Sequence, residues 1–297
     1  MLNSNKNSSF EVDNSSIQGD FTYGGNMGLK MLTITQTNAG TIVGENWPSS
    51  DVVETVEVAN VEQLTNALNI STVKNIILIE PLTLDGALDL RGKTLSLSEN
   101  FNFGESKAAI MFNGEYGLSN GTFKASSSDD TKYMISSKVG LHLSDNFELV
   151  AEDNLNGIYV EDNGCAIYRN TSITVAKGHA FKAVSNNAKV FLQMDANATI
   201  NGNVFLEANN PSIDNNNIHL MGDDESGYGR INGNVTITSV PNATVVYIDI
   251  AKEGLITGKV TGGKVIVENS GQGGGNQGGG NNQGGNTTGN DFWFEEL

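Results

Sequence analysis

The stretch from Val61 to Leu97, VEQLTNALNISTVKNIILIEPLTLDGALDLRGKTLSL, begins with a helical pattern and then changes to short strands. One face of its first two turns is apolar and predicts a short amphipathic helix: Val61, Leu64, Ala67 and Leu68. Asn60 is a good N-cap, and Gln63 occupies the third helical position, which together form the pattern of a capping box. This stretch therefore predicts one small helix at the start of a β-rich region.

Four short apolar segments follow the helix: IILI (76–79), LTL (82–84), ALDL (87–90) and TLSL (94–97). These segments recur every six or seven residues, a spacing too short for ordinary hairpins. The spacing indicates a chain that turns a corner after each strand. Similar segments continue to about residue 268, separated by corners rich in Asn and Gly, two residues that tolerate left-handed backbone conformations.

Short strands at regular spacing are typical of a sandwich, a propeller or a solenoid. Two features favour the solenoid. The segments are shorter than most sandwich strands, and asparagines at successive corners can stack in hydrogen-bonded ladders along the axis. The sequence therefore predicts an all-β chain folded as a parallel β-helix, with about 20 to 25 residues per coil.

Residues 58–97, VANVEQLTNALNISTVKNIILIEPLTLDGALDLRGKTLSL, resemble the N-terminal cap and first coils of right-handed parallel β-helix proteins of the pectate-lyase-like superfamily. The likeness is specific over this segment and general over residues 98–268. It implies a single-stranded right-handed parallel β-helix whose open end is covered by the short helix. Capping has a physical reason, since an open end exposes unpaired backbone.

Composition limits the function. The net charge is −17, only three residues are Arg, and 39 are Asn. Phosphate contacts need clustered Lys and Arg, so no nucleic-acid partner is predicted. A strongly acidic surface repels acidic polysaccharides, which leaves neutral glycans and protein partners. The first residues contain no apolar core of a signal peptide, and no stretch reaches 18 apolar residues, so neither a signal peptide nor a membrane span is predicted.

The predicted organisation has four parts. Residues 1–50 form an appendage, in part disordered, with a β-hairpin at about 30–44 around Asn38-Ala39-Gly40. Residues 51–270 form the β-helix. Residues 271–290 form a flexible linker with ten Gly in twenty residues. Residues 291–297, DFWFEEL, form an aromatic and acidic peptide.

The peptide after the linker is the most informative feature for function. Aromatic side chains are the usual anchors of binding hot spots, so its apolar residues are predicted to bind a protein partner: Phe292, Trp293, Phe294 and Leu297. The alternative is that the peptide folds back and caps the open last coil. The partner is preferred because a cap would not need so long a flexible segment.

Catalytic candidates are few. Gly222-Asp223-Asp224 resembles the paired aspartates of polygalacturonase-like enzymes, and Gly178-His179-Ala180 resembles their Gly-His-Gly element. Their order is reversed, and the Asn-Thr-Asp and Arg-Ile-Lys elements of those enzymes are not found. Asp223, Asp224 and His179 therefore remain candidates only for an alternative, enzymatic interpretation. No metal site and no cofactor are predicted.

Tyrosines in the strands offer a way to hold sugars. Tyr159, Tyr168 and Tyr228 are candidates for a glycan-stacking strip, although alternation along the strands should turn about half of the tyrosines inward. Cys165 is most simply a small core residue, and the isolated His142 and His219 are more simply structural than catalytic.

These observations predict a non-enzymatic structural or adhesion protein. Its architecture, a rod with an appendage at each end, resembles bacteriophage fibre, spike and head-decoration proteins, which implies a virion or extracellular location, a capsid or tail protein as partner, and a homotrimer as one option. A secreted carbohydrate-active enzyme and a bacterial surface adhesin remain the alternatives.

Overall fold

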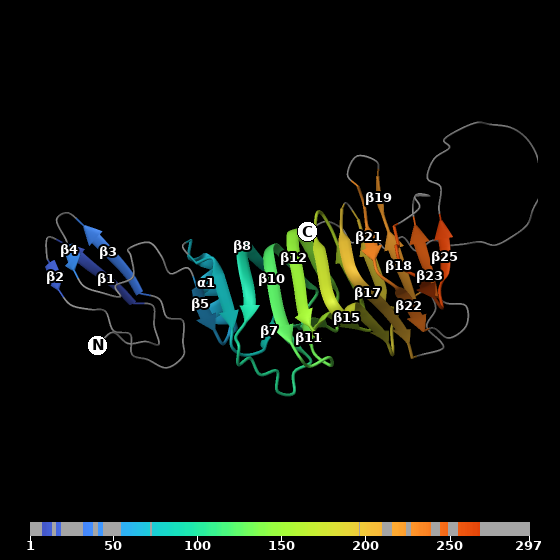
Figure 1. Ribbon diagram of the computed structural model, residues 1–297, viewed down its shortest axis with the longest axis horizontal. Coiled ribbons are helices and arrows are strands. Elements are labelled where there is room, and N and C mark those ends of the chain that lie inside the picture. Colours follow the sequence, from blue (N-terminus) through green and yellow to red (C-terminus); the bar gives the residue numbers. More distant parts are fainter. Residues whose placement is uncertain are drawn as a thin grey trace, which may run out of the picture.

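The protein is a parallel β-solenoid with one short helix near its start (Figure 1). The computed structural model describes residues 55–71, 73–195, 197–209, 216–223, 227–238, 244–248 and 255–267, together with the backbone of four strands between residues 8 and 43. The expected linker and the peptide at 291–297 lie outside the described residues, as do most of residues 1–54.

Helix α1 (Val61–Asn69) begins as the capping pattern predicts. The Asn60 side chain accepts a hydrogen bond from the Gln63 backbone N–H at 2.9 Å, and the Gln63 side chain accepts one from Ala59 N–H at 2.7 Å. Its apolar face packs into the solenoid core through three buried residues: Leu64, Ala67 and Leu68. The helix contacts β5 (Thr55–Val58), β7 (Leu82–Leu84) and β8 (Leu88–Leu97), so it takes the place of strands in the first coil.

The strands stack on three faces, which we call A, B and C in the order in which each coil visits them. Several long strands pass from one face to the next across a corner. The strands that contribute to face A are β5, β6 (Asn75–Leu78), β8, β10 (Tyr116–Ser127), β12 (Leu141–Asp153), β15 (Ser172–Ser185), β17 (Thr199–Ala208) and β21 (Arg230–Asn232).

Faces B and C are built in the same way. Face B contains β7, β9 (Ala108–Phe112), β11 (Tyr133–Ser137), β13 (Asn156–Glu161), the later parts of β15 and β17, β22 (Val235–Thr238) and β24 (Val260–Thr261). Face C contains the first parts of β8, β10 and β12, then β14 (Gly164–Ile167), β16 (Phe191–Met194), β18 (Asn216–Leu220), β23 (Thr244–Ile248) and β25 (Lys264–Val267).

One column of inward side chains follows the whole length of face A. Its members pair from coil to coil in register: Val56, Ile76, Leu95, Phe123, Leu149, Ile173, Ile200, Ile231 and Ile256. All but Ile256 are at most 3% exposed. This column and its counterparts on faces B and C form one continuous core. Burying each such side chain contributes about 1.5–3 kcal/mol to the stability of the fold.

Coil length varies more than the sequence predicts. Successive members of the face A column are separated by as few as 19 residues, from Ile76 to Leu95, and by as many as 31, from Ile200 to Ile231. The corners between faces C and A use the expected residues in left-handed conformations, among them Asn120 (φ 51°) and Asn170 (φ 57°). At the Arg91-Gly92 corner both residues have positive φ, and β8 continues through the corner. The segments 87–90 and 94–97, which were predicted as separate strands, are therefore parts of one strand.

The predicted hairpin at about 30–44 is wrong. Strands β3 (Leu32–Thr37) and β4 (Thr41–Val43) do not pair with each other; β3 pairs in parallel with β1 (Ser8–Asp13), and β4 pairs in parallel with β2 (Ser16–Gln18). Alternating apolar residues on both sides of a short turn describe a solenoid corner as well as a hairpin, because both need two short strands and a tight turn.

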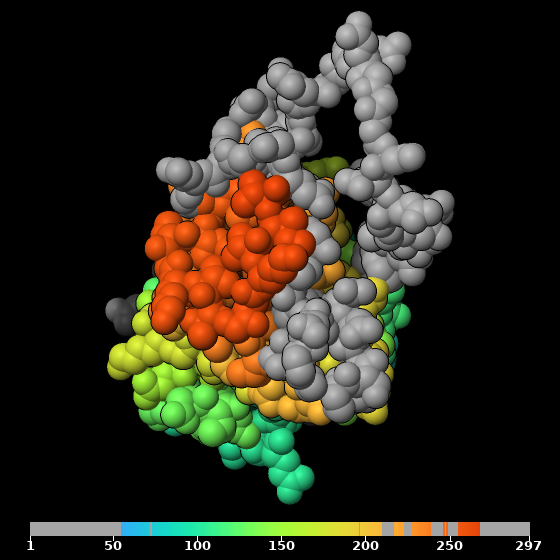
Figure 2. All heavy atoms as spheres, turned by 90° about the vertical axis from the view of Figure 1, so that its right-hand side faces the viewer, coloured from blue at the N-terminus to red at the C-terminus, as the bar shows by residue number. Residues whose placement is uncertain are grey.

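The two ends of the solenoid differ. Helix α1 covers the first coil, whereas the last described coil leaves two apolar side chains uncovered: Val265 is 44% exposed and Val267 is 49% exposed. Figure 2 looks onto this last coil, which is drawn in orange. No helix among the described residues is long and apolar enough to cross a membrane.

Candidate ligand-contact surface

A polar and aromatic strip lies on the outer side of face B. Tyr159, Lys182 and Phe205 pair in register across β13, β15 and β17. Their neighbours along each strand point into the core, so alternation turns these three side chains outward. We call Tyr159, Lys182 and Phe205 the face B strip. Parallel strands are about 4.8 Å apart, so Tyr159 and Phe205 are separated by roughly 9.6 Å along the axis.

Tyr159 is held in place by a lysine and a second tyrosine. The Lys107 Nζ lies 3.5 Å from the centroid of the Tyr159 ring, and the Tyr133 ring lies 5.2 Å away, tilted by 53°. Burial lowers the pKa of Lys107, and the nearby charge of Lys182 lowers it further. Burial also raises the pKa of Tyr133 to about 12 and raises that of Tyr159, so both phenols are neutral hydrogen-bond donors at neutral pH.

Phe205 is flanked by charged and polar groups. The Lys182 Nζ lies 5.2 Å from the centroid of the Phe205 ring and 3.0 Å from Oε2 of Glu207. The His179 ring lies 5.3 Å from that of Phe205. Burial, and then the charge of Lys182, lower the pKa of His179, which favours the neutral imidazole. Its Nδ1 is buried without a hydrogen-bond partner among the described residues.

This arrangement suits recognition of a polar ligand with apolar patches. Sugar rings pack their C–H faces against aromatic rings, and their hydroxyls pair with charged side chains. The Lys182–Glu207 ion pair offers both a donor and an acceptor beside Phe205. One side of the Tyr159 ring is occupied by Lys107, so only the rest of that ring is available.

The other two predicted stacking tyrosines lie elsewhere. Tyr168 follows β14 on face C, where its ring stacks on His142 at 6.1 Å and 18°. Burial, with help from the charge of Asp195, raises its pKa to about 12. Tyr228 belongs to β20 (Gly227–Tyr228), which pairs antiparallel with β19 (Gly222–Asp223), and its side chain packs against the core. The structure therefore does not bring the three tyrosines together.

The catalytic candidates are not brought together in the part of the chain that the structure describes. The backbone of Asp223 belongs to β19, but its side chain and all of Asp224 lie outside the described residues. His179 lies in β15 beside Phe205. Among the described residues, no group of three His, Cys, Asp or Glu is placed to hold a metal ion. Cys165 is fully buried in the core, as predicted, and burial raises the pKa of its thiol.

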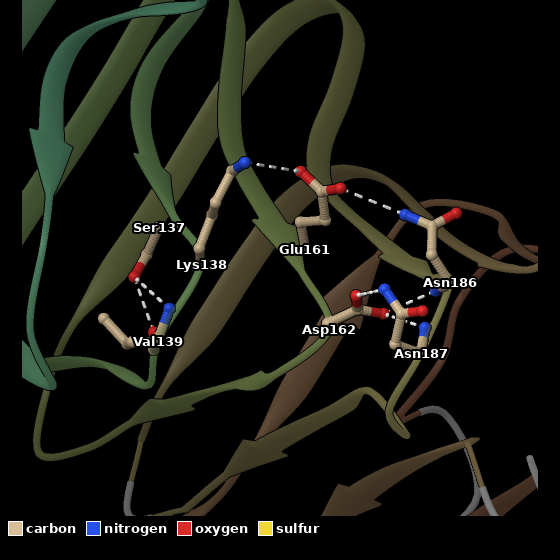
Figure 3. A network of polar contacts seen from close by, with 7 residues as sticks. All are labelled: Ser137, Lys138, Val139, Glu161, Asp162, Asn186 and Asn187. Atoms are coloured by element: carbon tan, nitrogen blue, oxygen red, sulfur yellow. Dashed lines mark hydrogen bonds and ion pairs between the residues drawn. The ribbon is translucent and has the colours of Figure 1, made fainter.

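A polar network occupies the corner between faces B and C (Figure 3). Asp162 accepts hydrogen bonds from the backbone N–H groups of Asn186, Asn187 and Ala188 in the next coil. Glu161 accepts one from the Asn186 side chain at 3.1 Å. These groups satisfy one another across two coils, so the network is structural.

The face B strip combines one predicted residue with several that the sequence interpretation missed. Tyr159 was predicted; Lys107, Lys182, Phe205 and Glu207 were not. A signal was present, because Tyr159, Lys182 and Phe205 recur every 23 residues, within the predicted coil length. The predicted partner-binding residues Phe292, Trp293, Phe294 and Leu297 lie outside the described residues.

Comparison of this chain with protein-family models, with curated proteins and with solved structures gives no match. The candidate surface therefore rests on its own geometry.

Proposed function

We propose that this chain is a non-enzymatic structural or adhesion protein, in which a β-solenoid rod presents the face B strip to a glycan. The observation that carries the proposal is the alignment of Tyr159, Lys182 and Phe205 in one register on the outer side of a fully packed face. Residues on adjacent rungs of a solenoid keep their spacing because each rung is hydrogen-bonded to the next.

A neutral glycan fits this strip better than an acidic one. Lys182 is already neutralised by Glu207 at 3.0 Å, and the whole chain has a net charge of −17, which repels polyanions. An extended chain of sugars running along the axis would contact Tyr159 and Phe205, two rungs apart, with two different units.

The proposal also includes a protein partner for residues 291–297, DFWFEEL, whose aromatic residues supply anchors on an acidic peptide. A rod with such a peptide suits a fibre or head-decoration component of a virion, or a bacterial surface adhesin. Kinship with the pectate-lyase-like superfamily, which rests on the likeness of residues 58–97, belongs to the same proposal.

The direct test is binding of the full chain to an array of neutral polysaccharides and oligosaccharides. Phe205→Ala and Tyr159→Ala should each weaken binding by about five- to tenfold, corresponding to about 1–1.5 kcal/mol for a stacking contact. Ser96→Ala is the control, since Ser96 is an outward residue of face A and lies away from the face B strip.

Two outcomes oppose the proposal. Binding that is equally strong in Phe205→Ala, Tyr159→Ala and the wild type would remove the face B strip from the ligand surface. Release of sugar products from a neutral polysaccharide, lost on Asp223→Asn with Asp224→Asn, would make the chain an enzyme. Detection of the chain in purified virions would separate the virion component from the bacterial adhesin.

A further inference from the structure

The last coil of the solenoid ends in an uncovered core surface. Val265 and Val267 of β25 lie in register over Val246 and Ile248 of β23. The two residues of β23 are 0% and 8% exposed, whereas the two valines above them are 44% and 49% exposed. Val265 and Val267 therefore continue the core columns of face C but have nothing stacked on them among the described residues.

The backbone at this end is open as well. Within the described residues, β24 pairs with β22 and β25 pairs with β23, each on one side only. The opposite edges of β24 and β25 leave N–H and C=O groups for a further strand or segment. A segment that occupies the end would gain both apolar contacts with the valines and backbone hydrogen bonds.

The charged side chains among the described residues of the last coil are all positive. Residues 255–267 contain Lys259 and Lys264, both exposed, and no carboxylate, although the net charge of the whole chain is −17. Two copies meeting end to end would bring these lysines together, which disfavours that occupant. An acidic peptide with apolar side chains is complementary to this end, because its apolar groups can cover the valines and its carboxylates can pair with the lysines.

The chain itself carries such a peptide. Residues 291–297, DFWFEEL, contain three aromatic residues, one leucine and three carboxylates. They are joined to β25 by residues 268–290, and a Gly-rich chain of that length spans roughly 25 Å on average. This span covers the end of the solenoid from which the linker starts.

We propose that residues 291–297 dock on the uncovered last coil of the same chain, with the aromatic side chains over Val265 and Val267 and the carboxylates near Lys259 and Lys264. Tethering favours the same chain over a neighbour, because a short flexible linker gives an effective concentration in the millimolar range. The docked peptide caps the solenoid, and any external partner of the peptide has to displace it. This inference does not need the external partner or the glycan.

The test uses Trp293 as a reporter in the full chain. The protein has two tryptophans, so Trp47→Phe leaves Trp293 as the only one. Docking predicts that acrylamide quenches Trp293 several-fold less than it quenches the free peptide DFWFEEL. Val267→Asp and Lys264→Glu should each restore quenching toward that of the free peptide, since one places a charge in the apolar contact and the other reverses the charge complementarity.

Val61→Asp is the matched control, because Val61 is 40% exposed at the opposite end of the solenoid and should leave quenching unchanged. Far-UV circular dichroism checks that each variant keeps its β-structure. If Val267→Asp loses it, Lys264→Glu decides the result, since its side chain is exposed. Quenching equal to that of the free peptide, or protection unaffected by Lys264→Glu, overturns the proposal. Protection that appears only as protein concentration rises also overturns it, because the peptide would then dock between copies.

Discussion

Asp162 accepts hydrogen bonds from both the backbone and the side chain of Asn187, at 2.7 Å and 2.9 Å, and thereby joins two successive coils. Burial by itself raises the pKa of this carboxyl. The hydrogen bonds from Asn187, Asn186 and Ala188 outweigh burial and hold the pKa below its ordinary value. The charged form of Asp162 therefore stabilises the folded state.

Asp162→Ala should lower the free energy of unfolding at pH 7 by about 1–2 kcal/mol, because it leaves three backbone N–H groups without their acceptor. Since the folded-state pKa lies below that of the unfolded state, the stabilisation is complete above the ordinary pKa of aspartate and is lost as pH falls through the folded-state pKa. Urea unfolding of both proteins at pH 7 and at pH 3 measures this. A difference that does not shrink at pH 3 would contradict the charge-based account.

The Asn156 side chain joins three successive coils. Its side chain is buried, donates to the carbonyls of Asp130 and Lys132 at 2.6 and 3.0 Å, and accepts from His179 N–H at 2.8 Å. Asn156→Ala should lower the free energy of unfolding by about 2–3 kcal/mol, because buried polar groups lose their partners. Asn100→Ala, in an exposed turn, is the control and should change little.

The same Asn156 side chain explains why residue 178 is a glycine. Gly178 has a φ of +78°, and a Cβ there would lie 2.4 Å from Oδ1 of Asn156. Gly178→Ala should therefore destabilise the protein as well, through both backbone strain and displacement of the Asn156 amide. In Asn156→Ala the contact is removed, so the added effect of Gly178→Ala should be smaller in that background. A double-mutant cycle by urea unfolding measures the difference, and full additivity would contradict the contact.

Lys93 is buried, at 7% exposed, and its Nζ donates to the carbonyl oxygens of Ile70 and Val73 at 2.8 and 2.6 Å. These carbonyls follow helix α1, so the lysine fastens the capping helix to the first coil. Lys93→Met keeps the length of the side chain but removes both bonds, and should destabilise the protein by about 2–3 kcal/mol. Lys124→Met is the control, since Lys124 makes an exposed ion pair with Glu152. Equal effects of the two substitutions would contradict this role.

The charged carboxylate of Asp195 is expected to destabilise the fold. Burial raises its pKa to about 6, although the charge of Arg169 opposes the shift, and its Oδ1 has no hydrogen-bond partner among the described residues. Because the folded state holds the proton more tightly than the unfolded state, stability falls as pH rises from about 4 to 6. Asp195→Asn should therefore raise the melting temperature at pH 7.5 but not at pH 4. An equal rise at both values would show that the effect is not ionic.

Local sequence patterns predicted most of the fold. The helix at Val61–Asn69, its cap, and the strand at Leu82–Leu84 were all predicted, because the capping box and strict alternation of apolar residues are local signals. The asparagine corners were predicted from the tolerance of Asn for left-handed conformations. The pairing of β3 and β4 was mispredicted, because strand partners are chosen by contacts far apart in sequence.

The candidate surface was less predictable. Tyr159 and Lys182 become neighbours only when coil length is known to the residue, and coil length varies from 19 to 31 along face A. The burial of Lys93 was not predicted for a different reason: a lysine is usually exposed. Only the position of the helix end explains its burial.

The unequal coils have a mechanical consequence. Hydrogen bonds between rungs run along the solenoid axis, so a force applied to the two ends loads them directly, and the coils should yield one after another. A coil of 19 to 31 residues releases about 65–105 Å of chain when it is fully extended. Each coil would therefore leave its own step length in a single-molecule extension trace, and the order in which the coils break could be read from the order of the steps.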